Sequence, residues 1–124
     1  MRGLSLFCLV TAGLYALCAM GLGIVMAASH DHSLAPVHAH LNLVGWVSVA
    51  LFGIFYHLVP AAASGLLARI QVAIATLGVI LLAPGIGIAV TGGTELLAII
   101  GSLLTLTSMA LFVVVVVQSR LRPA

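Results

Sequence analysis

The sequence has very few charged residues. Two of its 124 residues are acidic and four are basic, so charged side chains make up 5% of the chain, against about a quarter in an average soluble protein. Hydrophobic residues make up 64%, and the mean hydropathy is +1.38. This composition indicates an integral membrane protein. The net charge of +2 is small and its basic residues are scattered, which argues against nucleic acid as a partner.

The chain is also poor in groups that cross-link or catalyse. Cys8 and Cys18 lie in one apolar stretch, about 15 Å apart along a helix, which is too far for a disulfide. We expect both to be inert buried thiols. Asp31 and Glu95 are the only carboxylate side chains, and neither falls within an apolar stretch to form an acid–base pair. We therefore expect no independent enzymatic activity, although a role as an oxidoreductase subunit stays open.

Four apolar stretches are long enough to cross a membrane, which takes about 20 residues. The predicted helices cover residues 4–28, 36–59, 66–90 and 95–118. Pro36 suits a first helical turn, Pro60 ends the second helix in a short turn, and Thr94 can cap the fourth. No linker or repeat divides the chain. The prediction is a single all-α domain, residues 1–124, folded as an integral membrane four-helix bundle.

The charges predict an orientation. The basic residues are Arg2, Arg69, Arg120 and Arg122. With four spans, all of them fall at the end that holds both termini, whereas Asp31 and Glu95 fall at the other end. The positive-inside rule then places both termini in the cytoplasm (N-in/C-in) of a bacterial inner membrane. The loop at 29–35 and the start of the second helix would face outward.

The segment Pro36-Val-His-Ala-His-Leu-Asn-Leu-Val-Gly-Trp46 is the most informative part of the chain. Polar, titratable groups at the mouth of a spanning helix are costly and are kept mainly for function. At about 100° per residue, His38 and His40 point about 160° apart and cannot share one metal from a regular helix. His38 shares a face with Asn42, Gly45, Phe52 and Tyr56. His40 heads an apolar stripe of Val44, Val47, Leu51, Ile54 and Leu58, and an imidazole above apolar walls suits a heme.

Other interpretations of the histidines stay open. One is a Cu or Zn site at the outer face, with Asp31 or Glu95 as a further ligand; its histidines would be His30, His32, His38 and His40. Alternatively, the two loop histidines are merely solvated, or the histidines line the interface of an assembly or scaffold subunit. His57 lies about 25 Å further along the helix, where it is as readily an interfacial residue as a ligand.

The third predicted helix contains Pro84-Gly-Ile-Gly87 at a depth similar to that of His40. Pro84 removes a backbone donor and predicts a kink. Gly85 and Gly87 have no side chains and would then open space for a flat ligand. The alternative is a proline kink with close glycine packing, which is common in membrane helices.

The run His40-Leu-Asn-Leu-Val-Gly-Trp46, continued by Leu51-Phe-Gly-Ile-Phe-Tyr56-His-Leu-Val-Pro60, resembles the second helix of the heme-copper oxidase catalytic subunit. It is most similar to nitric oxide reductases and cbb-type oxidases, over about a fifth of the chain. The resemblance implies a reduced four-helix relative in which His40 is an axial ligand of heme b. Its expected role is electron transfer, or gas or heme handling.

The departures from that family limit what the chain can do alone. The family's second axial histidine and its copper ligands lie on later helices, where this sequence has none. No arginine lies at the outer side to neutralise heme propionates. A complete oxygen- or NO-reducing centre is therefore not expected within one chain.

A six-coordinate heme needs a second axial ligand. A second copy of the chain can supply its own His40 across a two-fold axis, or Met20, Met26 or Met109 can serve. We favour a homodimer, because a short chain gains burial by pairing. The expected partners are thus membrane lipid, a second copy and a redox partner.

Overall fold

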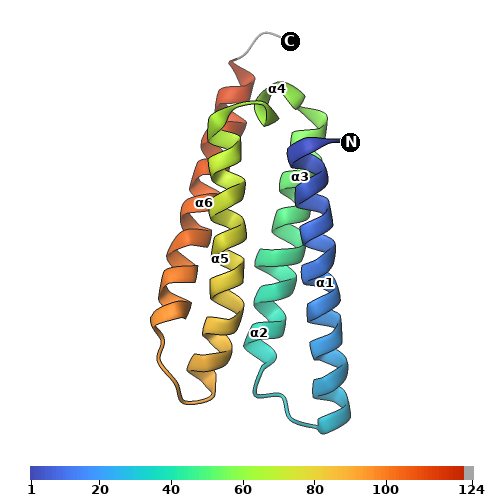
Figure 1. Ribbon diagram of the computed structural model, residues 1–124, viewed down its shortest axis with the longest axis vertical. Coiled ribbons are helices and arrows are strands. Elements are labelled where there is room, and N and C mark those ends of the chain that lie inside the picture. Colours follow the sequence, from blue (N-terminus) through green and yellow to red (C-terminus); the bar gives the residue numbers. More distant parts are fainter. Residues whose placement is uncertain (122–124) are drawn as a thin grey trace.

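The computed structural model describes residues 1–121 (Figure 1), which are largely helical and contain no β-strand. The chain forms α1 (Gly3–Ser29), α2 (Ala35–His40), a π-helical segment (Leu41–Val47), α3 (Ser48–Leu58), α4 (Pro60–Ala63), α5 (Leu66–Val90) and α6 (Leu96–Arg120). Within the described residues, four continuous stretches are long and apolar enough to cross a membrane, the second being Ala35–Leu58. The all-α, four-helix prediction is confirmed, and the helix bounds agree to within two residues.

Two local features differ from the prediction. The expected turn after Pro60 begins with a short helix, α4, and the second span contains a π-helical segment where a regular helix was expected. The expected cap at Thr94 is displaced by one residue: Glu95 directly precedes α6 and makes no side-chain capping bond, while Thr94 Oγ1 accepts a hydrogen bond from the Leu96 N–H at 3.2 Å. Arg122, which belongs to the predicted basic tail, lies outside the described residues.

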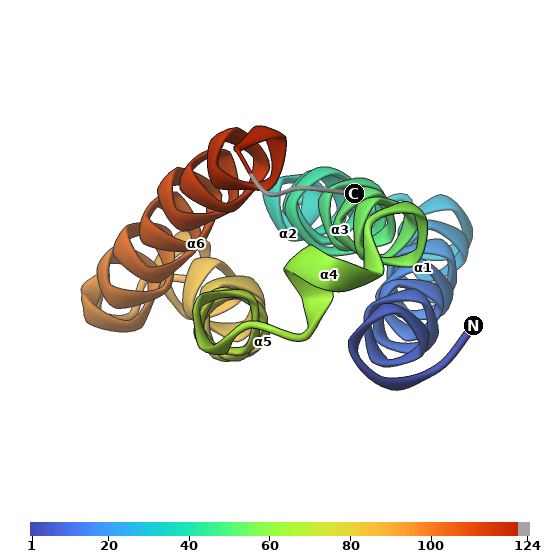
Figure 2. The same ribbon diagram turned by 90° about the horizontal axis from the view of Figure 1, so that it is seen from above.

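The bundle consists of two antiparallel helix pairs. In Figure 2, α1 lies beside the α2–α3 helix on one side, and α5 lies beside α6 on the other. The α5–α6 pair is held at close range by glycines. A Cβ on Gly85 would lie 2.5 Å from the Ala98 amide nitrogen, and a Cβ on Gly101 would lie 2.5 Å from that of Leu82. Residues without side chains let the two backbones approach closely, as is common between membrane helices.

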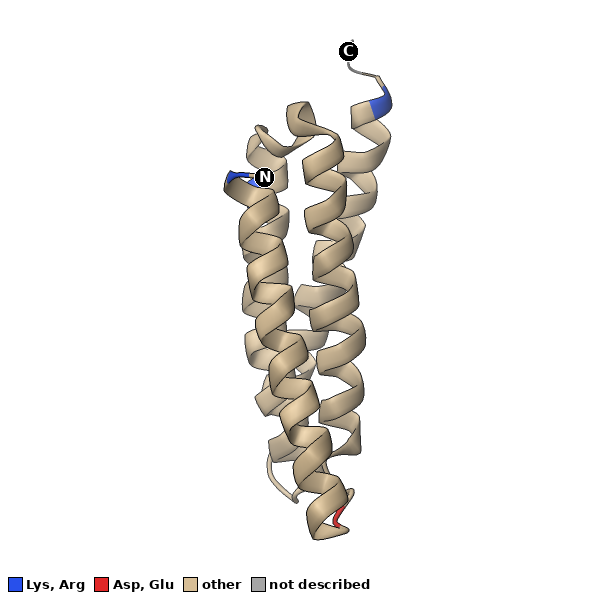
Figure 3. Cartoon of the chain, turned by 90° about the vertical axis from the view of Figure 1, so that its right-hand side faces the viewer, with Lys and Arg blue, Asp and Glu red and all other residues tan. Residues whose placement is uncertain are grey.

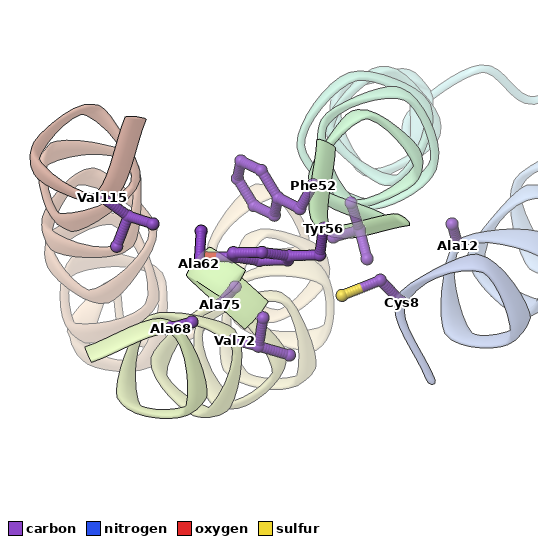
Figure 4. Close-up of a cluster of buried hydrophobic side chains, with 10 residues drawn as sticks. Cys8, Ala12, Phe52, Tyr56, Ala62, Ala68, Val72, Ala75 and Val115 are labelled. Atoms are coloured by element: carbon purple, nitrogen blue, oxygen red, sulfur yellow. The ribbon is translucent and has the colours of Figure 1, made fainter. Parts of the chain in front are cut away.

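The core lies between the two pairs and draws on α1, α3, α4, α5 and α6 (Figure 4). Its buried residues are Cys8, Ala12, Val49, Phe52, Tyr56, Ala62, Ala68, Val72, Ala75 and Val115. Phe112 packs on the Phe52 ring, with centroids 4.6 Å apart. Cys18, which we expected to be buried, is instead exposed on the apolar surface of α1.

A buried hydrogen-bond network joins three helices. Tyr56 Oη of α3 donates to Gln71 Oε1 of α5 at 2.8 Å, and Gln71 Nε2 donates to Ser108 Oγ of α6 at 2.9 Å. Ser108 Oγ in turn donates to the main-chain oxygen of Gln71 at 3.0 Å. All three side chains are at most 1% exposed. Buried polar groups need such partners because desolvating them unpaired is costly, so the network fixes how α3, α5 and α6 meet.

The fixed charges lie at opposite ends of the bundle (Figure 3). We call the end with Arg2, Arg69 and Arg120 the basic end, and the end with Asp31 and Glu95 the acidic end. Between them the helices present apolar side chains to the surroundings, with residues such as Leu17, Leu51 and Leu106 more than half exposed. This distribution matches a bundle whose middle contacts lipid.

Candidate functional site

The site begins where the second span enters the bundle at the acidic end. Pro36 lies in the first turn of α2, as predicted. The π-helical segment, Leu41–Val47, follows directly after the two histidines. Ser48 Oγ donates to the Leu43 carbonyl oxygen at 2.6 Å, five residues back. Segments of π-helix are rare, and they occur frequently at functional sites. Hydropathy alone does not distinguish such a segment from a regular helix.

His38 points into the bundle and holds α2 against α1. Its Nδ1 lies 2.8 Å from the Ala19 carbonyl oxygen, and since a carbonyl only accepts, Nδ1 carries the proton. Asn42 Nδ2 lies 3.4 Å from His38 Nε2 and donates to the His38 carbonyl oxygen at 3.0 Å. A Cβ on Gly23 would lie 3.0 Å from the imidazole, so the small residues of α1 make room for this ring. Both ring nitrogens therefore face protein partners.

His40 points out of the bundle. Its Nδ1 lies 2.7 Å from the Pro36 carbonyl oxygen, and the side chain is exposed. Nδ1 must donate this bond, which leaves the Nε2 lone pair free and directed away from the backbone partner. Metal-ligating histidines commonly have this arrangement, because the second hydrogen bond fixes the tautomer and the ring orientation. His38 and His40 therefore lie on different faces of the second span, as predicted.

Apolar residues continue the surface that His40 heads. Val44 is half-buried, whereas Val47, Leu51, Ile54 and Leu58 are exposed, with exposed fractions of 43%, 56%, 46% and 73%. A flat apolar group held at His40 would therefore lie against aliphatic side chains on the outside of the four-helix bundle.

The remaining histidines lie apart from His40. His30 and His32 are exposed in the loop between α1 and α2, and His57 is exposed near the basic end. In the same loop, the Ser33 N–H donates to Asp31 Oδ1 at 3.0 Å and lowers the pKa of that carboxyl. Among residues 1–121, no three His, Cys, Asp or Glu side chains are placed to share one metal ion. One chain thus does not gather the four outer histidines into a Cu or Zn centre.

The two glycines that follow Pro84 have different surroundings. Gly85 opens no space, because the α6 backbone at Ala98 fills it; there the expectation was wrong and the packing alternative holds. A Cβ on Gly87 would meet only Val37 Cγ2, at 3.7 Å, and Leu34 Cδ2, at 4.0 Å. Gly87 lines an apolar groove of about 520 Å³ between α1, α2 and α5, and His40 is not among the residues of that groove.

The three candidate methionines, Met20, Met26 and Met109, lie in different surroundings. Met26 is buried and only 6% exposed, and Met20 is 62% exposed on α1. Met109 and Val44 line the same cavity of about 280 Å³. However, Met109 lies about 20 Å from the start of α6, whereas His40 lies about 8 Å from the start of α2. The two side chains are at different depths.

Comparison of the chain with protein-family models, with curated proteins and with solved structures finds no match. The geometry of His40 and the motif that surrounds it are therefore the features of the chain that point to a function.

Proposed function

We propose that this protein is a b-type heme-binding membrane protein that serves electron transfer, or gas or heme handling, with His40 as an axial ligand. The observation that carries the proposal is the state of the His40 ring. Its Nδ1–H is committed to the Pro36 carbonyl oxygen at 2.7 Å, and its Nε2 is free on an exposed apolar surface. An imidazole nitrogen beside apolar walls is what heme ligation requires.

Each neighbouring residue has a distinct role in this proposal. The Pro36 carbonyl oxygen orients the His40 ring, while Val44 and Val47 provide the apolar wall along the helix. His38 and Asn42 position the ligand by fixing α2 to α1 through the Ala19 carbonyl oxygen. When bound, the heme would supply a one-electron redox couple, which the chain's own side chains lack.

The second axial ligand would come from a second copy of the chain. His40 lies on the outside of its own bundle, so a ligand from the interior of that bundle cannot face it. A two-fold axis would bring the two exposed His40 rings toward one iron atom and would cover the apolar stripes of both chains. An electron-transfer partner would complete the assembly.

The orientation belongs to the same proposal. The basic end would face the cytoplasm of a bacterial inner membrane, following the positive-inside rule, and the His40 end would face outward. Among residues 1–121, no arginine lies at the acidic end, so the heme propionates would be partly hydrated at the membrane surface.

The absorption spectrum of the purified protein tests the proposal. We expect a Soret band, one heme per two chains, and loss of the band in His40→Ala because no free imidazole remains at that position. His57→Ala, which alters a histidine at the other end, should retain full heme. His38→Gln should also retain most of it, because His38 positions the ligand without being one.

Two results would overturn this function. One is a full heme complement in His40→Ala with normal membrane insertion. The other is a wild-type protein that contains copper or zinc but no heme, which would favour the outer-face metal site.

A further inference from the structure

The basic end contains a hollow that the heme proposal does not use. It is formed where the start of α1, the end of α3, α4 and the start of α5 converge, and its volume is about 620 Å³. Small-molecule pockets fall in the range of roughly 300–1,000 Å³. The polar and charged side chains that line it include Arg2, His57, Ser64 and Arg69. We call it the basic hollow.

The arginines of the basic hollow have no acidic side chain to neutralise them. The sequence contains only two carboxylate side chains, Asp31 and Glu95. Asp31 lies between α1 and α2 and Glu95 between α5 and α6, so both are at the opposite end of the bundle. Two arginines, whose guanidinium groups are positively charged, therefore line one cavity that has no carboxylate side chain beside it. Such an arrangement attracts an anion from outside the chain.

The walls of the hollow are fixed by local structure. Ser5 Oγ donates to the Arg2 carbonyl oxygen at 3.0 Å and anchors the start of α1. On the other side, Ser64 Oγ donates to the Ala61 carbonyl oxygen at 2.9 Å. Because that bond uses the Ser64 hydroxyl proton, Ser64 cannot donate the same proton to an anion in the hollow. The arginines therefore supply the charged hydrogen-bond donors. Guanidinium groups bind phosphate oxygens with paired hydrogen bonds.

We propose that the basic hollow binds a phosphate group, with the headgroup of an anionic phospholipid as its natural source. Basic pockets between membrane helices bind such headgroups at the cytoplasmic side. Free phosphate shares this chemistry and is the other source. The proposal gives His57 a role at the headgroup that is independent of heme binding at the acidic end.

The experiment compares protein in lipid nanodiscs of three kinds: phosphatidylcholine alone, phosphatidylcholine with phosphatidylglycerol, and phosphatidylcholine with inorganic phosphate in the buffer. Native mass spectrometry then counts retained phosphatidylglycerol or phosphate. Each arginine in direct contact with a bound headgroup is expected to contribute a factor of about five in affinity. The variant Arg2→Gln/Arg69→Gln should therefore bind about 25-fold more weakly than wild type. The control Arg120→Gln changes an arginine at the same end that does not line the hollow, and it should bind as wild type does.

Each outcome decides a point. Retention of phosphatidylglycerol alone supports the lipid source, and retention of inorganic phosphate as well supports the phosphate site with free phosphate as a second source. No retention of either, or equal losses in Arg120→Gln and the double variant, overturns the site. If the double variant does not fold, Arg2→Lys/Arg69→Lys replaces it. That variant keeps the charge but loses the paired hydrogen bonds, so it should bind more weakly than Arg120→Gln; binding equal to it would overturn the role of the guanidinium groups.

Discussion

Replacing Gln71 with leucine should destabilise the bundle by removing the centre of the buried network. The substitution deletes both side-chain hydrogen bonds of Gln71, at 2.8 Å and 2.9 Å. Tyr56 Oη loses its acceptor at a site where the residue is 1% exposed. Ser108 keeps its bond to the main-chain oxygen. An orphaned buried group costs about 1–3 kcal/mol, while interhelical hydrogen bonds in membranes average about 0.6 and reach about 1.7 kcal/mol. We expect a loss of about 1–2 kcal/mol.

The origin of that loss can be separated by a double-mutant cycle. Tyr56→Phe removes the orphaned hydroxyl. The double variant Tyr56→Phe/Gln71→Leu should therefore lose about 1 kcal/mol less unfolding free energy than the two single variants lose together. The assay is reversible unfolding in mixed micelles with increasing dodecyl sulfate, followed by far-ultraviolet circular dichroism. Thr107→Val is the control, because Thr107 is exposed and bonds only to its own helix. Additive single effects would refute the network as a coupled unit.

Two further predictions test packing and topology. Gly85→Ala should cost about 1–3 kcal/mol of stability by overpacking against Ala98. Gly87→Ala should be neutral or stabilising, because the nearest neighbour of an added Cβ is 3.7 Å away. The same unfolding assay compares the two variants, and equal effects would contradict the difference in packing. A cysteine at Ser33, in a chain with Cys18→Ala, should react with a membrane-impermeant maleimide from the periplasmic side. Labelling only after the membrane is opened would reverse the orientation.

The sequence predicted the elements of this fold well because apolar length alone determines where a chain can span a membrane. It also predicted the opposite directions of His38 and His40, because that requires only the helical period. It did not predict that His38 would bind Ala19 across to α1, since this contact depends on how two helices pack. The buried network was missed as well. A lone glutamine in a long apolar helix was its signal, because Gln71 could be buried there only with partners.

The glycines show where a residue type alone is ambiguous. Gly85 and Gly87 are two positions apart and have the same side chain, yet one meets the α6 backbone and the other lines a groove. The direction in which each glycine faces around the α5 axis decides whether it packs on a neighbour or borders open space. The positions of the neighbouring helices determine which directions are filled. The short helix α4 was missed for a related reason, since a four-residue element has no hydropathy period of its own.

The network and the aromatic cluster of Phe52, Tyr56 and Phe112 both lie nearer the basic end, so they join the two helix pairs unevenly along the membrane. Toward the acidic end, an apolar groove of about 520 Å³ lies between α1, α2 and α5, so the hydrogen-bond network, rather than cavity volume, distinguishes the two ends. Local opening free energies follow such differences in packing. Backbone amides near His40 should therefore exchange with deuterium sooner than those around Gln71. In the proposed dimer, docking at His40 would then leave the buried network of each bundle intact.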